Sequence, residues 1–263
     1  MALTPGPRAA VMLAWLVAAC SKPDPAPRRT EPWLASPSTS SAVGSGPRAY
    51  RFASDSAVRF SVSGRKGKLE GRVPLRRGEL RLDPRHLEVV SASADFDLSK
   101  LSIETDAPNA AELGGAAPST LALQWLELGS QVSPERRAQF ENARFELSSV
   151  EHLSHTFLDL GSARKPSSVR ATAVGTLLIH GFRAPVRVEV LLGAVATSPG
   201  AVPRLSIRSA AALVVPLAPH DITARDAAGI VDALGRTRTA DWVGKSARVD
   251  FELVAEPVTT SAK

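Results

Sequence analysis

The chain has 263 residues, of which 44% are hydrophobic, enough for one large β-domain or two small ones; this composition excludes a wholly disordered protein. The formal charge is +6, but the basic residues do not cluster with interleaved aromatics, so we expect no nucleic-acid partner. The single cysteine, Cys20, excludes an intramolecular disulfide and a cysteine-based metal site within one chain.

Residues 1–19 have the pattern of an export signal. One positive charge, Arg8, precedes an apolar run of 11 residues, Ala9–Ala19. This run is shorter than the roughly 20 residues that a transmembrane helix needs, and it has the length of a signal-peptide core. It ends in Val17–Cys20, which resembles the bacterial lipobox, so we predict that Cys20 carries the lipid. An ordinary secretory signal with an unrelated cysteine is the alternative.

The lipobox resemblance implies a mature chain that starts at Cys20 and is anchored by acyl chains, each buried CH₂ contributing ~0.8 kcal/mol. Ser21, not an aspartate, follows the cysteine. We therefore expect an exported protein on the periplasmic face of the outer membrane. Residues 20–47 are rich in proline and serine and poor in apolar groups, which predicts a disordered tether.

From about Tyr50, apolar and polar residues alternate along many short runs, as in antiparallel strands with one buried face. Turn signals separate several runs, for example Arg77–Gly78 and Asp83–Arg85. This pattern predicts an all-β barrel or sandwich. The clearest runs are Val58–Val62, Leu69–Leu75, Leu80–Leu82, Ala92–Leu98, Phe145–Leu147, Val186–Val190, Leu205–Ile207 and Val249–Leu253.

A helical segment interrupts the strands. Leu121, Trp125 and Leu128 have helical spacing, and Gly129 is the expected C-terminal cap. Ser133 and Pro134 predict the N-cap and first residue of a second short helix that runs to about residue 142.

Three stretches, in this order, resemble the YceI-like, polyisoprenoid-binding family: Tyr50–Val62, Trp125–Leu147 and Val174–Val186. The first is similar to the family's opening hairpin, and the second to its helical insertion and the strand after it. The family's Arg-x-x-Phe-Gly segment near the penultimate strand is replaced by Val214–Ile222.

The third stretch carries most of the resemblance. It is similar to the family's glycine-led strand, beginning here at Gly175, with a turn at His180–Gly181 and a return strand opened by Pro185. We expect His180 to fix this turn and not to perform chemistry.

The resemblance implies a lipocalin-like antiparallel β-barrel of about eight strands over residues 48–256, with a short helical insertion and a disordered tail at 257–263. It implies an apolar tunnel for an isoprenoid or lipid-like small molecule, without catalysis or cofactor, and it allows a homodimer. About eight strands leave room for side chains or one slender ligand. The candidates for the tunnel wall, whose alternative role is packed core, are Phe60, Val62, Val73, Phe96, Phe145, Leu147, Leu177, Ile179, Val188 and Phe251.

A second hypothesis is a structural or interaction lipoprotein. The small inward residues Ala92, Ala94, Ala171 and Ala173 would then let the walls close the cavity, leaving the function to loops such as those at residues 106–119 and 218–241.

An enzyme is not expected. The sequence has no Gly-x-Ser-x-Gly elbow and no paired carboxylates in an apolar setting. His152 and His155 have no third ligand nearby, so no metal site is expected. Asp221 and Asp226, close to His220 and Arg225, are interpreted as the rim of a loop.

Overall fold

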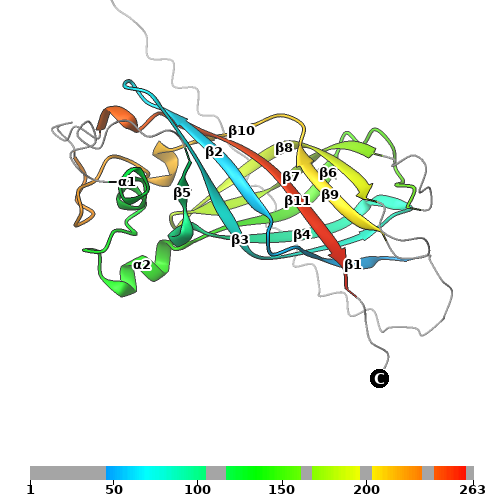
Figure 1. The fold of residues 1–263 in the computed structure, drawn as a ribbon. Helices are drawn as coiled ribbons and strands as arrows, with labels where there is room; N and C mark the ends of the chain where they lie inside the picture. The colour runs from blue at the N-terminus through cyan, green and yellow to red at the C-terminus, as the bar shows by residue number, and fades with distance from the viewer. Residues whose placement is uncertain (1–45, 105–116, 161–167, 196–202, 233–239, 259–263) are drawn as a thin grey trace, which may run out of the picture. The chain divides into compact units, whose positions relative to one another are not determined.

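The computed structural model describes residues 46–104, 117–160, 168–195, 203–232 and 240–258, which form a β-barrel (Figure 1). The expected signal peptide, Cys20, and the tether up to residue 45 lie outside the described residues. So do residues 106–116 and 233–239 of the two loops named above and residues 259–263 of the expected tail.

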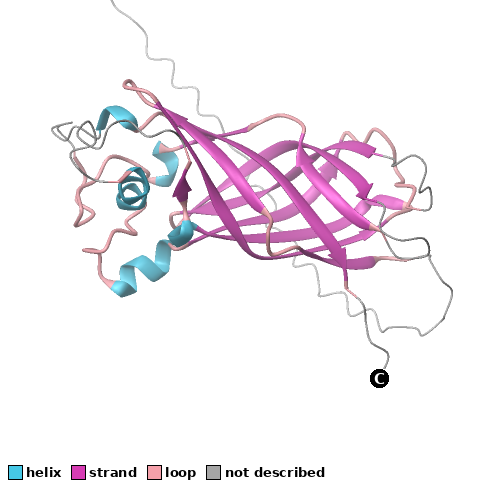
Figure 2. Cartoon of the chain, viewed as in Figure 1, coloured by secondary structure: helices cyan, strands magenta, loops and turns pink. Residues whose placement is uncertain are grey.

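Eight strands close into a ring in which every neighbouring pair is antiparallel (Figure 2). The predicted all-β, lipocalin-like barrel of about eight strands is confirmed. In order around the ring the strands are β11 (Ser246–Pro257), β2 (Ala57–Ser63), β3 (Lys68–Asp83), β4 (His86–Asp97), β6 (Asn142–Glu151), β7 (Ser168–Ile179), β8 (Phe182–Val195) and β9 (Arg204–Ser209), which pairs again with β11.

Three short strands extend this ring where the long strands overhang their neighbours. β1 (Arg48–Phe52) pairs with both β11 and β3 and so continues the position of β2. β10 (Leu213–Pro216) pairs with β11 beyond β9, and β5 (Ser102–Ile103) pairs with β3 beyond β4. The parts of β11 and β3 that overhang their neighbours are thereby hydrogen-bonded, which reduces the length of exposed strand edge.

β3 is one continuous strand, so the turn predicted at Arg77–Gly78 is wrong. A β-bulge shifts its register with β4 between Leu75 and Arg77, and Arg76 and Arg77 are both exposed. The bulge keeps the apolar residues on either side facing inward. Gly78 is required by packing and not by a turn, because a Cβ atom there would lie 2.3 Å from the ring of Phe52. The turn predicted at Asp83–Arg85 is confirmed between β3 and β4.

The helices α1 (Pro118–Trp125) and α2 (Pro134–Phe140) and the short 3₁₀ helices Leu98–Lys100, Ala218–His220 and Ala240–Trp242 gather at one end of the barrel (Figure 2). We call residues 117–141 and 217–232 the cap. No helix in the described part of the chain is long and apolar enough to cross a membrane.

α1 ends earlier than predicted, because Glu127 and not Gly129 takes the left-handed conformation that closes the helix. The φ angle of Glu127 is 55°. The amide of Leu128 donates to the carbonyl of Leu123, and that of Glu127 to Gln124, which is the Schellman pattern. The start of α2 is as predicted: Ser133 is the N-cap, and its hydroxyl accepts from the amide of Arg136.

Candidate ligand cavity

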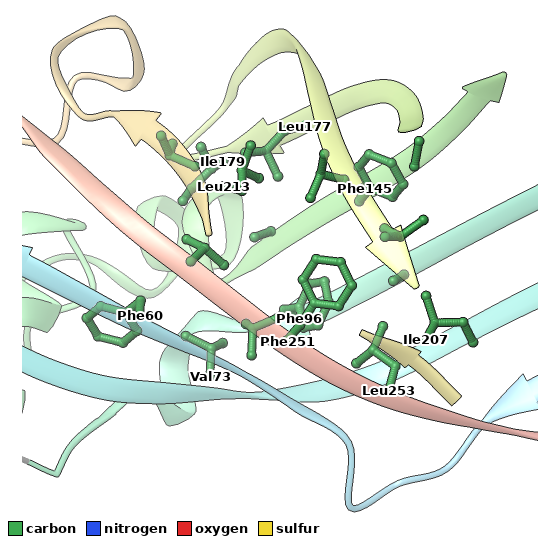
Figure 3. Close-up of a pocket in the computed structure, with 18 of the residues that line it drawn as sticks. Phe60, Val73, Phe96, Phe145, Leu177, Ile179, Ile207, Leu213, Phe251 and Leu253 are labelled. Carbon is green, nitrogen blue, oxygen red and sulfur yellow. The ribbon is translucent and has the colours of Figure 1, made fainter. Parts of the chain in front are cut away.

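The barrel encloses a cavity of about 300 Å³, and every residue of its wall except Ser93 is hydrophobic (Figure 3). This volume lies at the lower end of the ~300–1,000 Å³ typical of small-molecule pockets. Ser93 faces Glu79 and Glu146 across the ladder on the outer surface of β4. The interior therefore offers apolar surface and no charge, which suits the burial of a hydrocarbon chain.

The structure places all ten candidate side chains in the wall of this one cavity. They come from seven strands, and Figure 3 shows several of them pointing into the same space. Their contact with a ligand stays a prediction. The ten are Phe60 and Val62 on β2, Val73 on β3, Phe96 on β4, Phe145 and Leu147 on β6, Leu177 and Ile179 on β7, Val188 on β8 and Phe251 on β11.

The four inward alanines do not let the walls close, in contrast to the packed barrel of the second hypothesis. Ala92 and Ala94 on β4 and Ala171 and Ala173 on β7 all line the cavity. A closed ring of eight strands fixes the distance between opposite walls, so small side chains leave space between them.

The turn between β7 and β8 forms as predicted. His180 and Gly181 have φ angles of 49° and 81°, and Ile179 pairs with Phe182 across the two-residue loop. Positive φ at both central residues is the mark of a type I′ hairpin. Pro185 lies within β8 opposite Thr176, a few residues after the position at which the return strand begins.

His180 does more than shape this turn, because its ring is buried under the cap. It is 1% exposed, and its centroid lies 4.2 Å from that of Phe140. Its Nδ1 lies 2.9 Å from the backbone carbonyl of His220. A carbonyl only accepts, so Nδ1 carries the proton and donates.

Glu127, 1% exposed, is the centre of a polar cluster in the cap. Its Oε1 lies 3.1 Å from Nη1 of Arg225 and 3.7 Å from Nε2 of His180, and its Oε2 accepts from Nε of Arg136. Arg225, 4% exposed, also donates to the carboxylate of Asp221 at 2.6 Å. We call Glu127, Arg136, His180, Asp221 and Arg225 the cap cluster.

Two features of this cluster differ from the sequence interpretation. His220 and Arg225 are buried inside the cap, whereas Asp221 and Asp226, the two residues interpreted as a loop rim, are exposed. Glu127 was not among the candidates. Its one signal is that it is the single charged residue between Leu121 and Leu128.

The surroundings shift the pKa values of Glu127 and His180. Burial opposes the ionisation of Glu127, but the hydrogen bond from Arg136 and the charge of Arg225 outweigh it and hold its pKa below the usual range. Burial lowers the pKa of His180, and its hydrogen bond to His220 and the charge of Glu127 offset this only in part. At neutral pH the cluster thus contains an ionised Glu127 and a neutral His180.

Within the described ranges, no group of three or more His, Cys, Asp or Glu side chains is arranged to hold a metal ion. His152 and His155 lie in the irregular segment after β6.

A solved structure with the same fold supports this description. A polyisoprenoid-binding domain from Saccharophagus degradans, implicated in plant cell wall breakdown, superimposes with a TM-score of 0.50 at 15% identity, over 80% of this chain and 99% of that one. BcnA from Burkholderia cenocepacia gives 0.46 at 14% identity, over 76% and 95%. No protein-family model and no curated protein matches the chain. At 15% identity the first likeness shows the fold alone, and it confirms the barrel that the YceI-like resemblance implies.

Proposed function

We propose that this chain binds a long apolar or amphiphilic molecule of the polyisoprenoid class inside the barrel, as a carrier or a store, without catalysis. The observation that carries the proposal is the hydrophobic wall of the cavity. Burial of a prenyl chain there is favourable by roughly 25 cal/mol per Å² of apolar surface removed from water. Among the described residues, the wall offers no carboxylate, imidazole or thiol for acid–base or nucleophilic chemistry.

The fold of the Saccharophagus domain supports this class of ligand, because that protein is described as polyisoprenoid-binding.

We also propose that the protein works at a membrane. A diacylglyceryl group on Cys20 would hold it at the periplasmic face of the outer membrane, and residues 20–47 would give the barrel reach from the lipid surface. The support is the lipobox-like Val17–Cys20 and the composition of the tether. A homodimer is compatible with this arrangement, and no nucleic-acid partner is expected.

The first test is native mass spectrometry of the chain purified from bacterial cells, with organic extraction of bound material. We expect a co-purifying prenyl or acyl species at one per barrel. A chain that is empty, and that also takes up no added prenyl quinone, would contradict the proposal and favour the structural lipoprotein.

The second test places the ligand in the cavity. Trp125 lines the cavity, whereas Trp242 is buried outside its wall. A brominated fatty acid bound in the barrel should quench the emission of Trp125 by contact. The matched variants Trp125→Phe and Trp242→Phe separate these two signals, and both variants keep Trp15 and Trp33. Quenching on binding should therefore fall in the first variant and persist in the second. The reverse pattern would place the probe outside the barrel.

A further inference from the structure

The cap cluster lies directly behind one end of the cavity wall. In three separate segments of the chain, at the end of α1, in the β7–β8 turn and in residues 217–232, a residue that lines the cavity is followed or preceded by a residue of the cluster. The pairs are Leu126 with Glu127, Ile179 with His180, and Ile222 with Asp221. The polar contacts on one side of the cap therefore hold the apolar residues on its other side over the cavity.

The backbone at these points is held in an uncommon conformation. The described residues include four non-glycine positions with positive φ, and Glu127, His180 and Asp221 are three of them, at 55°, 49° and 53°. Residues other than glycine take this backbone conformation at a cost in free energy, and the conformation persists where surrounding contacts impose it. Glutamate at a helix end where glycine is usual indicates that the carboxylate is needed there.

The cluster is also incompletely bonded. Nε2 of His180 and Nε of Arg225, and Nδ1 of the neighbouring His220, are buried without a hydrogen-bond partner in the described part of the chain. Buried polar groups of this kind recover hydrogen bonds when water reaches them, which lowers the cost of opening relative to an apolar contact.

The opposite end of the barrel is held differently. There the amide of Leu158 donates to the carbonyl of Pro84 at 2.7 Å, and that of Leu87 to Thr156 at 3.0 Å. Leu87 and Leu158 are both buried in the hydrophobic core. Backbone bonds and packed leucines at this end contrast with the ion pairs at the other.

We propose that the cap is the gate of the cavity and that the ion pair of Glu127 with Arg225 keeps it closed. The ligand passes when Glu127 releases Arg225 and residues 217–232 move away from the barrel. This rests on the proposed function, since a gate matters only if a ligand passes. It makes Glu127 a residue that controls the rate of exchange and not the strength of binding.

The test is stopped-flow exchange of a fluorescent fatty acid with the full-length chain and with Glu127→Gln. The matched control is Asp95→Asn, which removes a buried carboxylate bonded to Arg77 and Arg144 on the outer wall of the barrel. We expect Glu127→Gln to accelerate both uptake and release about tenfold, with less than about a threefold change in Kd. Unchanged exchange rates in Glu127→Gln, or an equal acceleration in Asp95→Asn, would overturn the proposal that Glu127 keeps the gate closed.

Two further measurements keep the test decisive. Arg136→Gln removes the more exposed partner of Glu127 and leaves its pair with Arg225, so it is expected to fold and to accelerate exchange by a smaller factor. Amide hydrogen exchange needs no ligand: residues 217–232 should exchange faster in Glu127→Gln than in the wild type or Asp95→Asn. If the wild type binds neither a fatty acid nor a prenyl quinone, the proposed function fails, whereas unaltered amide exchange in the cap refutes the gating role of Glu127 itself.

Discussion

The ring of Phe145 lies directly over Gly175. A Cβ atom on Gly175 would be 2.7 Å from two carbons of that ring and 2.4 Å from the carbonyl oxygen of Glu146. Phe145 lines the cavity, and its ring can take this position in the wall because Gly175 has no side chain. Phe60 lies over Gly71 in the same way, at 2.8 Å. This is a physical reason for the glycine in the strand that resembles the YceI-like family.

Gly175→Ala is expected to displace the ring of Phe145 and distort β6. Overpacking of this kind costs about 1–3 kcal/mol, and the displaced ring should also weaken binding of a fluorescent fatty acid. Gly46→Ala is the matched control, because nothing lies within 4 Å of a Cβ there. Urea unfolding and probe titration of both variants check the prediction, and equal stabilities would show that the close approach is without consequence.

The cavity itself can be tested by filling it. Ala173 lines the cavity, whereas Thr172, next to it on β7, pairs with the outward-facing Glu151 and Glu189. Ala173→Leu should therefore reduce the affinity for a prenyl quinone about tenfold by occupying ligand space, while Thr172→Leu should leave it unchanged. The two variants place the same leucine side chain on opposite faces of one strand. Similar affinities in both would mean that the ligand does not enter this part of the barrel.

The wall of the cavity was predictable because the period of two in a strand assigns each residue to a face. Every one of the ten candidates follows from this rule and lines the cavity. The closed ring required the family resemblance, since alternation alone fits a barrel or a sandwich.

The cap cluster was not predictable in the same way. It joins Glu127, His180 and Arg225 from three segments far apart in the chain, and no local period links them. A glutamate with positive φ has no sequence signal either, because glycine is the ordinary residue at that helix position. Gly129 was therefore the natural but wrong choice for the end of α1. The turn predicted at Gly78 was wrong because a glycine can also be required by packing: Gly78 makes room for the ring of Phe52 inside a continuous strand.

The strain at Glu127 can be separated from the role of its carboxylate. Glu127→Ala and Glu127→Gly both delete the ion pair, but only glycine takes a φ of 55° without steric cost. Because the left-handed conformation costs other residues roughly 1–2 kcal/mol, we expect the glycine variant to be more stable than the alanine variant by about 1 kcal/mol. Paired urea denaturation curves measure this difference. An alanine variant that is equally stable would show that the cap relaxes once the carboxylate is gone.

Acid should weaken the cap, and His180 should be part of the cause. Burial lowers the pKa values of His180 and His220 below their ordinary value of about 6.5. Below that pH the unfolded chain binds protons that the native chain does not, so stability falls as the pH drops from about 6.5 towards the native pKa. Glu127 acts in a lower window: its pKa is lowered, so its contribution is lost only as the pH falls below about 4.3.

His180→Asn isolates this effect. Asparagine tolerates positive φ, and Asn-Gly is the preferred pair for a type I′ turn, so the hairpin should survive. The charged groups that face the ring, Glu127, Arg225 and Asp221, stay in place. Urea midpoints between pH 5 and 7.5 should fall less steeply in this variant than in the wild type, where one excluded proton contributes up to roughly 1.4 kcal/mol per pH unit. His155→Asn, at an exposed position, should keep the wild-type slope. If His180→Asn keeps it too, the acid sensitivity of the cap lies elsewhere, with His220 the first alternative because its ring is buried against the same hairpin.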